Sequence, residues 1–218
     1  MATPLPAPFH QAMALAWDSF RHGSLGIGAV ITVDDRTVAT GRNRLLEQDP
    51  GEDMLAGTSL AHAEMNAIAK LPWRQFRGEE VHLWTTLELC VQCLGAVRLS
   101  QVTHVHVLAP DPYFRGIGRI SGAHAALADN WPVIDHRPVD EWAAFSLLFQ
   151  THVAAFWGAA APGWFEALPA LGELAESLVA SGELIDIASS DPVVDEVADR
   201  LWSRLGVALD DIRALAAS

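Results

Sequence analysis

Two short segments contain residue types that together suit a metal ion. Residues 62–64 are His-Ala-Glu, and residues 90–93 are Cys-Val-Gln-Cys. One imidazole and two thiolates are a ligand set typical of zinc, and three protein ligands leave the fourth position for water. Zinc lowers the pKa of such a water and yields a hydroxide nucleophile. We therefore predict that His62, Cys90 and Cys93 bind zinc, and that Glu64 is a proton carrier and not a ligand.

The spacing of the cysteines leaves other interpretations open. Cys90 and Cys93 are the only cysteines of the chain, and they close too short a loop for a useful structural disulfide. A dithiol redox pair is one alternative. A non-catalytic zinc module is another, although a structural zinc site normally has four protein ligands and needs no glutamate. A fourth protein ligand would favour this second alternative.

The two motifs fall where a strand is followed by a helix. Apolar periodicity and turn residues predict strands at residues 28–33, 37–41, 81–86, 102–109 and 132–135, and helices at residues 9–21, 61–70, 91–100 and 121–129. Each cysteine lies at the start of a predicted helix, where the helix dipole favours a thiolate. Strands separated by helices require crossover connections. The sequence therefore predicts a three-layer α/β/α domain with a mixed sheet.

The pattern changes to all-helical after residue 139. An apolar stripe at helical spacing begins this region, formed by Trp142, Phe145, Phe149, Val153 and Phe156. It either forms an interface between subunits or packs the following helices on the core. Residues 159–161 are predicted to be a linker between helices. We divide the chain into a domain at residues 1–139 and an α-helical C-terminal extension at residues 140–218.

Charge argues against a nucleic acid or a membrane as the partner. The formal net charge is −13, and proteins that bind nucleic acids or anionic membranes need a cationic surface. Residues 1–139 contain 14 acidic and 11 basic groups, whereas residues 140–218 contain 13 and 3, and Lys70 is the only lysine. No segment resembles a signal peptide or a membrane span. We expect a cytoplasmic protein.

Beyond the two motifs, the chain resembles the cytidine deaminase-like superfamily. The resemblance covers residues 9–137 and rests on the segments GAVITV, GRNR, HAEMNAI, TTLELCVQCLGAVRLS and APDPYFRGIG. The H-x-E…P-C-x-x-C pattern is itself a known signature of zinc deaminases. The branch with tRNA adenosine, guanine and cytosine deaminases is the most similar. Membership implies a catalytic Glu64, zinc on His62, Cys90 and Cys93, and a homodimer.

The resemblance also implies residues that contact a substrate. Asn43 corresponds to a family asparagine that contacts the base or sugar, and Ala63 to a backbone N–H donor. Asp111 is in a loop where relatives contact the substrate, although Asp-Pro is also an ordinary turn. Phe114 in the same loop is predicted to stack on a base, or to pack structurally.

The chain departs from the family pattern in three places. Leu89 replaces the proline that precedes the first cysteine, which restores a backbone N–H and frees φ. Residues 51–59 form an added loop that we expect at the mouth of the site, and the C-terminal extension is also added. His104 and His106 share one strand face, for which we favour a packed or solvated face over a second metal site.

These observations predict a zinc-dependent hydrolase that deaminates a small substrate. The substrate is expected to be a free nucleobase, nucleoside or related aminated heterocycle of guanine or cytosine type. Zinc hydroxide attacks the amine-bearing carbon while Glu64 transfers protons, and ammonia is released. Deamination of wobble adenosine in tRNA is the main alternative, disfavoured because the arginines form no basic run.

Overall fold

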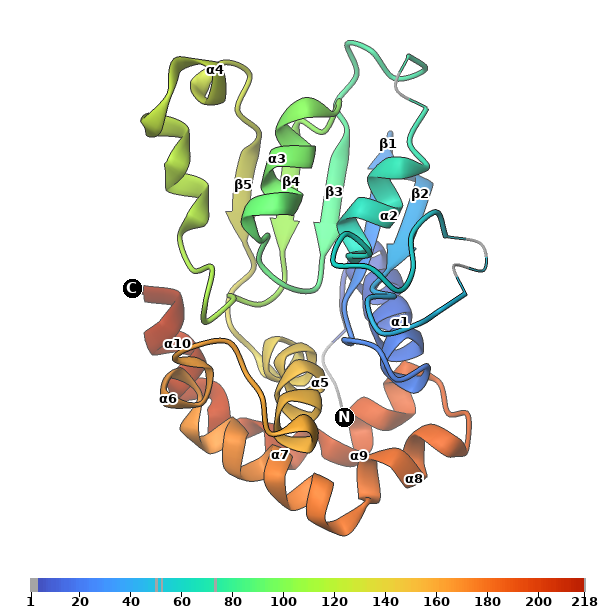
Figure 1. Cartoon of the computed structure of the whole chain (residues 1–218), viewed down its shortest axis with the longest axis vertical. Coiled ribbons are helices and arrows are strands. Elements are labelled where there is room, and N and C mark those ends of the chain that lie inside the picture. Colours follow the sequence, from blue (N-terminus) through green and yellow to red (C-terminus); the bar gives the residue numbers. More distant parts are fainter. Residues whose placement is uncertain (1–3, 50, 52, 73, 218) are drawn as a thin grey trace.

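A computed structural model describes residues 4–49, 51, 53–72 and 74–217. A mixed five-stranded sheet lies at its centre, in the order β2-β1-β3-β4-β5 (Figure 1). Strand β1 is antiparallel to β2 and to β3, whereas the β3–β4 and β4–β5 pairs are parallel. The strands are β1 (Gly28–Val33), β2 (Arg36–Arg42), β3 (His82–Thr85), β4 (His104–Val107) and β5 (Val133–His136). The predicted α/β class with a mixed sheet is confirmed.

Helices cover both faces of this sheet. Helix α1 (Ala7–Arg21) packs on one face, and helices α2 (Ala63–Ala69) and α3 (Val91–Leu99) pack on the other (Figure 1). Alternation along β3 shows the two sides. The ring of Trp84 contacts Phe9 of α1 at a centroid distance of 5.1 Å, whereas Thr85 hydrogen-bonds Glu64 of α2. The result is the predicted three-layer arrangement, with both sequence motifs on the α2–α3 side.

Two glycines allow the helices to lie directly on the strands. A Cβ atom on Gly41 would lie 2.2 Å from the carbonyl oxygen of Ala63, and one on Gly28 would lie 2.0 Å from that of Ala12. Both distances are too short for any side chain, so only glycine fits. Gly41 thereby allows the N-terminus of α2, where His62 and Glu64 are located, to pack against the sheet.

The strands predicted at residues 28–33 and 37–41 are present and pair as an antiparallel hairpin, whereas the helix expected at residues 121–129 is wrong over most of its length. Asp34 and Asp35 both have positive φ, as in the tight turns that join antiparallel strands. The other segment is a 3₁₀ helix at Ile117–Ala123, followed by the four-residue helix α4 (Ala125–Ala128). His124 begins α4 by accepting a hydrogen bond from the N–H of Ala126. This cap divides the segment into two short turns.

The C-terminal region is helical, as expected, and it shares the core of the sheet region. It contains α5 (Glu141–Trp157), α6 (Trp164–Ala167), α7 (Pro169–Ser181), α8 (Glu183–Ser189), α9 (Val194–Leu205), a short 3₁₀ turn (Gly206–Ala208) and α10 (Leu209–Ala217). These helices gather at one end of the sheet (Figure 1). The division at residues 139 and 140 stays a prediction.

Helix α5 is the element that joins the two parts. The ring of Phe149 lies 5.7 Å from that of Trp17 and 5.2 Å from that of Phe20, both on α1. Trp142 and Phe145 are also fully buried, so the predicted stripe packs on the core. It does not extend to Phe156, which is 63% exposed. In the part of the chain that the structure describes, no helix is long and apolar enough to cross a membrane.

Candidate metal centre and adjoining cavity

The two motifs meet at the N-termini of α2 and α3. His62 is the residue that precedes α2, and Cys90 holds the same position before α3, where its sulfur accepts a hydrogen bond from the N–H of Cys93. The Nδ1 atom of His62 lies 3.6 Å from the sulfur of Cys90 and 3.4 Å from that of Cys93. All three donor atoms lie within 4.8 Å of one another. Among the described residues, no other group of histidines, cysteines and carboxylates is close enough to hold a metal.

The geometry of this group fits zinc. A tetrahedral zinc ion with bonds of about 2.0 Å to nitrogen and 2.3 Å to sulfur separates the two donors by about 3.5 Å. The observed nitrogen–sulfur separations are 3.6 and 3.4 Å. One nitrogen and two sulfurs are also the soft and intermediate donors that zinc prefers. Three protein ligands leave a position for water, as a catalytic site requires.

The two thiols of the metal group differ in acidity. A hydrogen bond from the Cys93 side chain lowers the pKa of Cys90 to about 4, while the same contact and burial raise the pKa of Cys93 well above its usual range. The side-chain hydrogen bond with Cys90 raises the pKa of His62 against the effect of burial. Because zinc binds thiolates, binding of a metal by both sulfurs would require Cys93 to lose its proton.

Glu64 lies beside the metal group and is almost fully buried, at 4% exposure. Its Oε2 atom is 3.3 Å from the sulfur of Cys93, and its Oε1 atom is 2.6 Å from the hydroxyl of Thr85. Burial raises the pKa of Glu64, with the nearby His62 opposing. The Thr85 hydroxyl also lies 3.0 Å from the carbonyl oxygen of Leu87. That hydroxyl has one proton, which it donates to Glu64 with the Leu87 carbonyl oxygen as a second, more distant acceptor.

A cavity of about 370 Å³ opens beside His62, Glu64 and Cys90. Part of its wall comes from the N-terminal region, and the rest comes from α5, residues 159–161 and α6. The lining residues are Leu25, Ile27, His62, Glu64, Leu87, Glu88, Cys90, Asp111, Phe114, Gln150, Val153, Ala154, Ala159, Ala160, Ala161 and Trp164. Residues 159–161, which the sequence predicts to be a linker, are thus part of the cavity wall.

Two of the four predicted substrate residues line this cavity. Asp111 accepts hydrogen bonds from the N–H groups of Tyr113 and Phe114, so it also stabilises the turn that the Asp-Pro sequence predicts. Burial raises the pKa of Asp111 to about 6. Phe114 lines the cavity as well, whereas Tyr113 is 52% exposed. The structure therefore brings Asp111 and Phe114 to the metal group, and their contacts with a substrate stay predictions.

The other two predicted substrate residues are fully buried behind the cavity wall. Ala63 is the first residue of α2, and neither it nor Asn43 belongs to the lining. The Oδ1 atom of Asn43 accepts hydrogen bonds from the Ser24 hydroxyl and the N–H of Leu45. Its Nδ2 atom has no hydrogen-bond partner among the described residues. The roles of Asn43 and Ala63 in binding a substrate stay predictions.

Several residues that the sequence did not single out complete the site. Thr85 positions Glu64, and Gln150 and Trp164 form part of the far wall of the cavity. Glu88, which is 6% exposed, accepts hydrogen bonds from the N–H groups of Asp111 and Gly116. The only sequence signal for Glu88 was its position two residues before Cys90. A carboxylate so near a metal ligand is expected to be buried and therefore to need hydrogen-bond partners.

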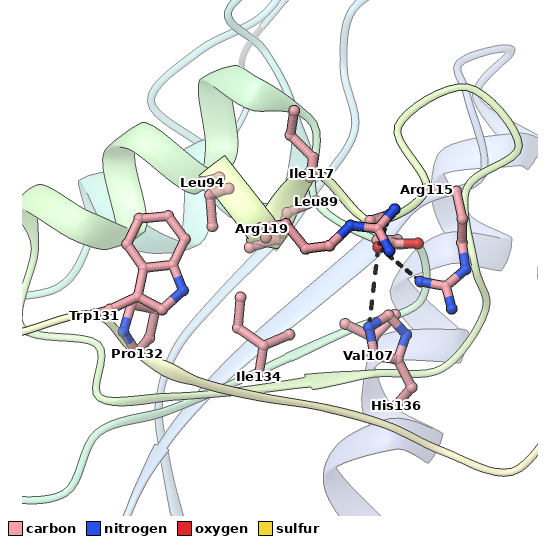
Figure 2. A pocket seen from close by; sticks show the side chains of 13 residues that line it. Leu89, Leu94, Val107, Arg115, Ile117, Arg119, Trp131, Pro132, Ile134 and His136 are labelled. Carbon is pink, nitrogen blue, oxygen red and sulfur yellow. Dashed lines mark hydrogen bonds and ion pairs between the residues drawn. The ribbon is translucent and has the colours of Figure 1, made fainter. Parts of the chain in front are cut away.

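Glu88 also lines a second cavity, of about 350 Å³. Figure 2 shows Arg115, Arg119 and His136 at one end of this cavity and Trp131 at the other. Leu89 belongs to its wall and is 2% exposed. The departure from the family pattern at this position therefore lies in the wall of the second cavity, directly before Cys90.

The strand histidines pack against one another. The ring of His104 stacks on that of His82 at 4.4 Å, and His106 stacks on Trp84 at 3.8 Å. His106 Nδ1 lies 2.7 Å from a carboxylate oxygen of Asp135. These contacts match the packed strand face that the alternation in sequence favours.

The added loop at residues 51–59 lies away from the cavity lining. None of its described residues lines the cavity, so the expectation that it forms the mouth is wrong for that part.

The fold and the metal group define a zinc-binding α/β domain of one family. Residues 7–109 match the family described as the cytidine and deoxycytidylate deaminase zinc-binding region. This match covers just under half of the chain and agrees with the superfamily that its motifs resemble, and zinc is the metal that suits His62, Cys90 and Cys93.

Similar proteins include enzymes for tRNA and for free bases. The chain is 29% identical over 119 residues to the tRNA-specific adenosine deaminase 2 of Xenopus tropicalis, covering 51% of this chain and 65% of that protein. A crystal structure of the protein NE0047 in complex with 8-azaguanine is 21% identical, with a TM-score of 0.51, covering 65% of this chain and 80% of that one. The guanine deaminase of Nitrosomonas europaea is 21% identical, with a TM-score of 0.47, covering 62% of this chain and 79% of that one.

These matches cover too little of the chains, or are too distant, to assign a relative's activity to this protein. The chain spans less than two thirds of the Xenopus protein, so that protein's activity is not carried over here. The structural likeness to NE0047 supports the fold alone. Substrate choice depends on the residues of this chain's own cavity.

Proposed function

We propose that this protein is a zinc-dependent hydrolase that releases ammonia from a small aminated heterocycle, a guanine- or cytosine-like nucleobase or nucleoside. The observation that supports this most is the position of Glu64. Its buried carboxyl lies 3.3 Å from Cys93 and lines a cavity large enough for a small ligand. A structural zinc site needs no such group, so this position favours catalysis over a non-catalytic zinc module.

Each residue of the site has a distinct role in this reaction. His62, Cys90 and Cys93 would bind the zinc, which when bound polarises the attacking water. Glu64 takes a proton from that water and delivers it to the ring nitrogen beside the amine-bearing carbon. It then takes the remaining proton from the hydroxyl now bonded to that carbon and delivers it to the amine, which leaves as ammonia while the ring gains a carbonyl oxygen. Thr85 keeps the Glu64 carboxyl oriented through the 2.6 Å hydrogen bond.

The charges of the cavity support a neutral substrate. Three carboxylates, those of Glu64, Glu88 and Asp111, line it, and none of its lining residues is lysine or arginine. Phosphate groups would lose their hydration there without gaining a lysine or arginine side chain as partner. A free base or nucleoside avoids this cost, whereas a nucleotide does not. Lys70, the single lysine, is paired with Asp53 at 2.7 Å.

Deamination of adenosine in tRNA is the second candidate. The similarity to the Xenopus tRNA-specific adenosine deaminase favours it. An anticodon stem-loop would have to insert one nucleotide into the cavity while its phosphates stay outside. The acidic cavity does not oppose that arrangement, so the choice between the two candidates needs a direct measurement.

An ammonia-release assay tests both candidates. Zinc-loaded full-length protein is incubated with guanine, cytosine, adenine, cytidine, adenosine and an anticodon stem-loop with adenosine at the wobble position. We expect ammonia from one of the free bases or nucleosides and no inosine in the stem-loop. The matched control is Glu64→Gln, which should bind zinc equally and release about 10²–10⁴-fold less ammonia. Ammonia from none of the small substrates would contradict the proposal, and inosine in the stem-loop would replace it with the second candidate.

A further inference from the structure

The second cavity combines an apolar body with charged groups at one end. Its volume is about 350 Å³, and Figure 2 shows Trp131 at the end opposite to Arg115, Arg119 and His136. Its apolar lining includes Leu89, Leu94, Val107, Ile117, Trp131 and Ile134. An apolar wall with a few polar groups at one place is the usual form of a small-molecule site. This cavity is therefore a candidate site separate from the one beside the metal group.

The charges at the polar end do not balance. Glu88 has the only carboxylate among the described lining residues, and its Oε1 atom lies 3.5 Å from Nη1 of Arg115 and 3.9 Å from Nε2 of His136. Figure 2 marks both contacts with dashed lines. Burial lowers the pKa of His136 from the usual 6.5, so this ring is mostly neutral at pH 7. Arg115 thus compensates Glu88, and the positive charge of Arg119 is left over.

Arg119 is also the cation that a ligand can reach. Its side chain is exposed, and it forms no hydrogen bond or ion pair with the residues that the structure describes. Its guanidinium lies against Gly116, where a Cβ atom would collide with Nη2. Arg115 differs, because it also donates to the carbonyl oxygens of Leu215 and Ala216. The cavity therefore offers one arginine without a partner at the edge of an apolar space.

We propose that the second cavity binds a small aromatic monocarboxylate, with its carboxylate on Arg119 and its ring among Trp131 and the aliphatic side chains. A planar guanidinium matches a carboxylate in shape and charge, and an indole ring stacks on other aromatic rings. One spare positive charge matches one negative charge, whereas a phosphate monoester would bring up to two close to Glu88. This inference goes beyond the proposed deaminase activity and does not depend on it.

The cavity beside the metal group is poorly suited to the same ligand. It is lined by three carboxylates and by no lysine or arginine. Each cavity also has one tryptophan in its lining, Trp131 in the second cavity and Trp164 in the cavity beside the metal group. The signals of their indole N–H groups therefore report separately on the two cavities.

The first test compares two probes with the same ring and different charge, 2-naphthoate and neutral 2-naphthamide. Each is titrated into zinc-loaded full-length protein while the indole N–H signals are followed by NMR, with assignments from Trp131→Phe and Trp164→Phe. We expect 2-naphthoate to shift the Trp131 signal with a Kd below about 1 mM and to leave the Trp164 signal in place. The amide should bind about fivefold more weakly, because it lacks the charge that pairs with Arg119.

The second test removes the positive charge. Arg119→Ala should weaken binding of 2-naphthoate about fivefold and change binding of 2-naphthamide less than about twofold, because substitution and amide remove the same interaction. The matched control is Arg36→Ala, an exposed arginine of β2 that lines neither cavity. Ala161→Phe, which alters the lining of the cavity beside the metal group alone, is a second control. Both controls should bind 2-naphthoate like the natural sequence.

Four results would overturn the inference. They are no binding of 2-naphthoate at about 1 mM, equal binding of the two probes, a shift of the Trp164 signal in place of the Trp131 signal, and a loss of 2-naphthoate binding in Ala161→Phe but not in Arg119→Ala. Tighter binding of 2-naphthyl phosphate than of 2-naphthoate would overturn the assignment to a monocarboxylate. None of these measurements uses turnover, so an absence of ammonia release contradicts the proposed function and leaves this inference in place.

Discussion

The cavity has two walls that differ in chemistry. The wall from α2, α3 and the loop at residue 111 contains the metal group and all three carboxylates. The wall from α5, residues 159–161 and α6 contains alanines, Val153, Trp164 and the single amide of Gln150. The first wall has the groups suited to moving protons and binding a metal, and the second is almost entirely apolar. Under the proposed function, the groups for the reaction are therefore concentrated in the first wall, whereas the second mainly limits the size and shape of a ligand.

The second wall is held in place by close packing and by hydrogen bonds of α5. Phe145 and Phe149 are fully buried, Ser146 bonds to Thr86, and the indole N–H of Trp164 donates to the Thr151 hydroxyl at 3.1 Å. Such packing leaves few alternative positions for α5 and α6. Substitutions of the metal ligands or of Glu64 should abolish turnover, and substitutions in the second wall should change affinity.

The largest expected effect is loss of a metal ligand. Cys93→Ala removes one of three donors, and the zinc content should fall from about one per chain to far below one, with ammonia release below detection. Metal analysis of the purified protein and the ammonia assay measure both effects. The matched control is Gln92→Ala, between the two cysteines, which should keep zinc and activity. Full zinc content in Cys93→Ala would remove Cys93 from the metal group.

The first wall could be predicted because its chemistry restricts residue type and position. Thiolates and an imidazole that bind zinc, with a glutamate beside them, are a rare combination at two helix N-termini. The strands and helices that position these residues can be predicted from apolar alternation and helical spacing, because these patterns mark the buried faces. Even the approach of α2 to the sheet depends on a visible feature, the glycine at position 41.

The second wall could not be predicted because it depends on tertiary packing. The stripe on α5 correctly indicated a buried helix, but nothing in the spacing shows which core surface it covers. Gln150 lies between two stripe residues, and its role depends on the contact with Gly26, 124 positions earlier. Residues 159–161 have the composition of a linker. Only the fold of the whole chain places them in the cavity wall.

Glu88 connects the first wall to the second cavity, so its replacement tests how rigid the first wall must be. Glu88→Gln keeps the size of the side chain but removes the charge that accepts hydrogen bonds from the N–H groups of Asp111 and Gly116. We expect about 2 kcal/mol lower stability and a higher KM, because these bonds hold the loop with Phe114. Urea unfolding and steady-state kinetics measure the two effects.

The control for Glu88 comes from the same second cavity. Arg119 is exposed and lines that cavity without lining the one beside the metal group. Arg119→Ala should change stability by no more than about 0.5 kcal/mol and leave KM unchanged. If Arg119→Ala raised KM as much as Glu88→Gln does, the two cavities would not be separate in function.

A change confined to the second wall should affect binding and leave the metal group intact. Ala161→Phe adds a bulky ring at a half-buried lining position, and we expect about a tenfold higher KM, equivalent to about 1.4 kcal/mol, with zinc content unchanged. Ala180→Phe, at an exposed position of α7 outside the lining, is the matched control. A fall in kcat with unchanged KM would contradict the separation of the two walls.

The smallest effect compares two polar side chains on α5 that each have an unpartnered atom. Both side chains are buried: Gln150 has an amide oxygen, and His152 a ring nitrogen, without a hydrogen-bond partner among the described residues. Unlike Gln150, His152 does not line the cavity. It packs edge-on against the ring of Phe20, and burial lowers its pKa from the usual 6.5. Below pH 6.5 the unfolded chain therefore binds a proton at this position that the folded protein does not.

Stability should consequently fall as the pH falls through that region, by at most about 1.4 kcal/mol per pH unit for one proton. His152→Leu removes this contribution, so its free energy of unfolding should decline less than that of the natural sequence between pH 7.5 and 5.5, as measured by urea unfolding. His82 and His136, whose pKa values are also lowered, are unchanged in both proteins and cancel in the difference. Because His152 lies outside the lining, guanine and cytosine should bind the variant within twofold of the natural protein. A loss of base binding of about tenfold or more would show that a substitution on α5 outside the lining changes the cavity through the helix as a whole.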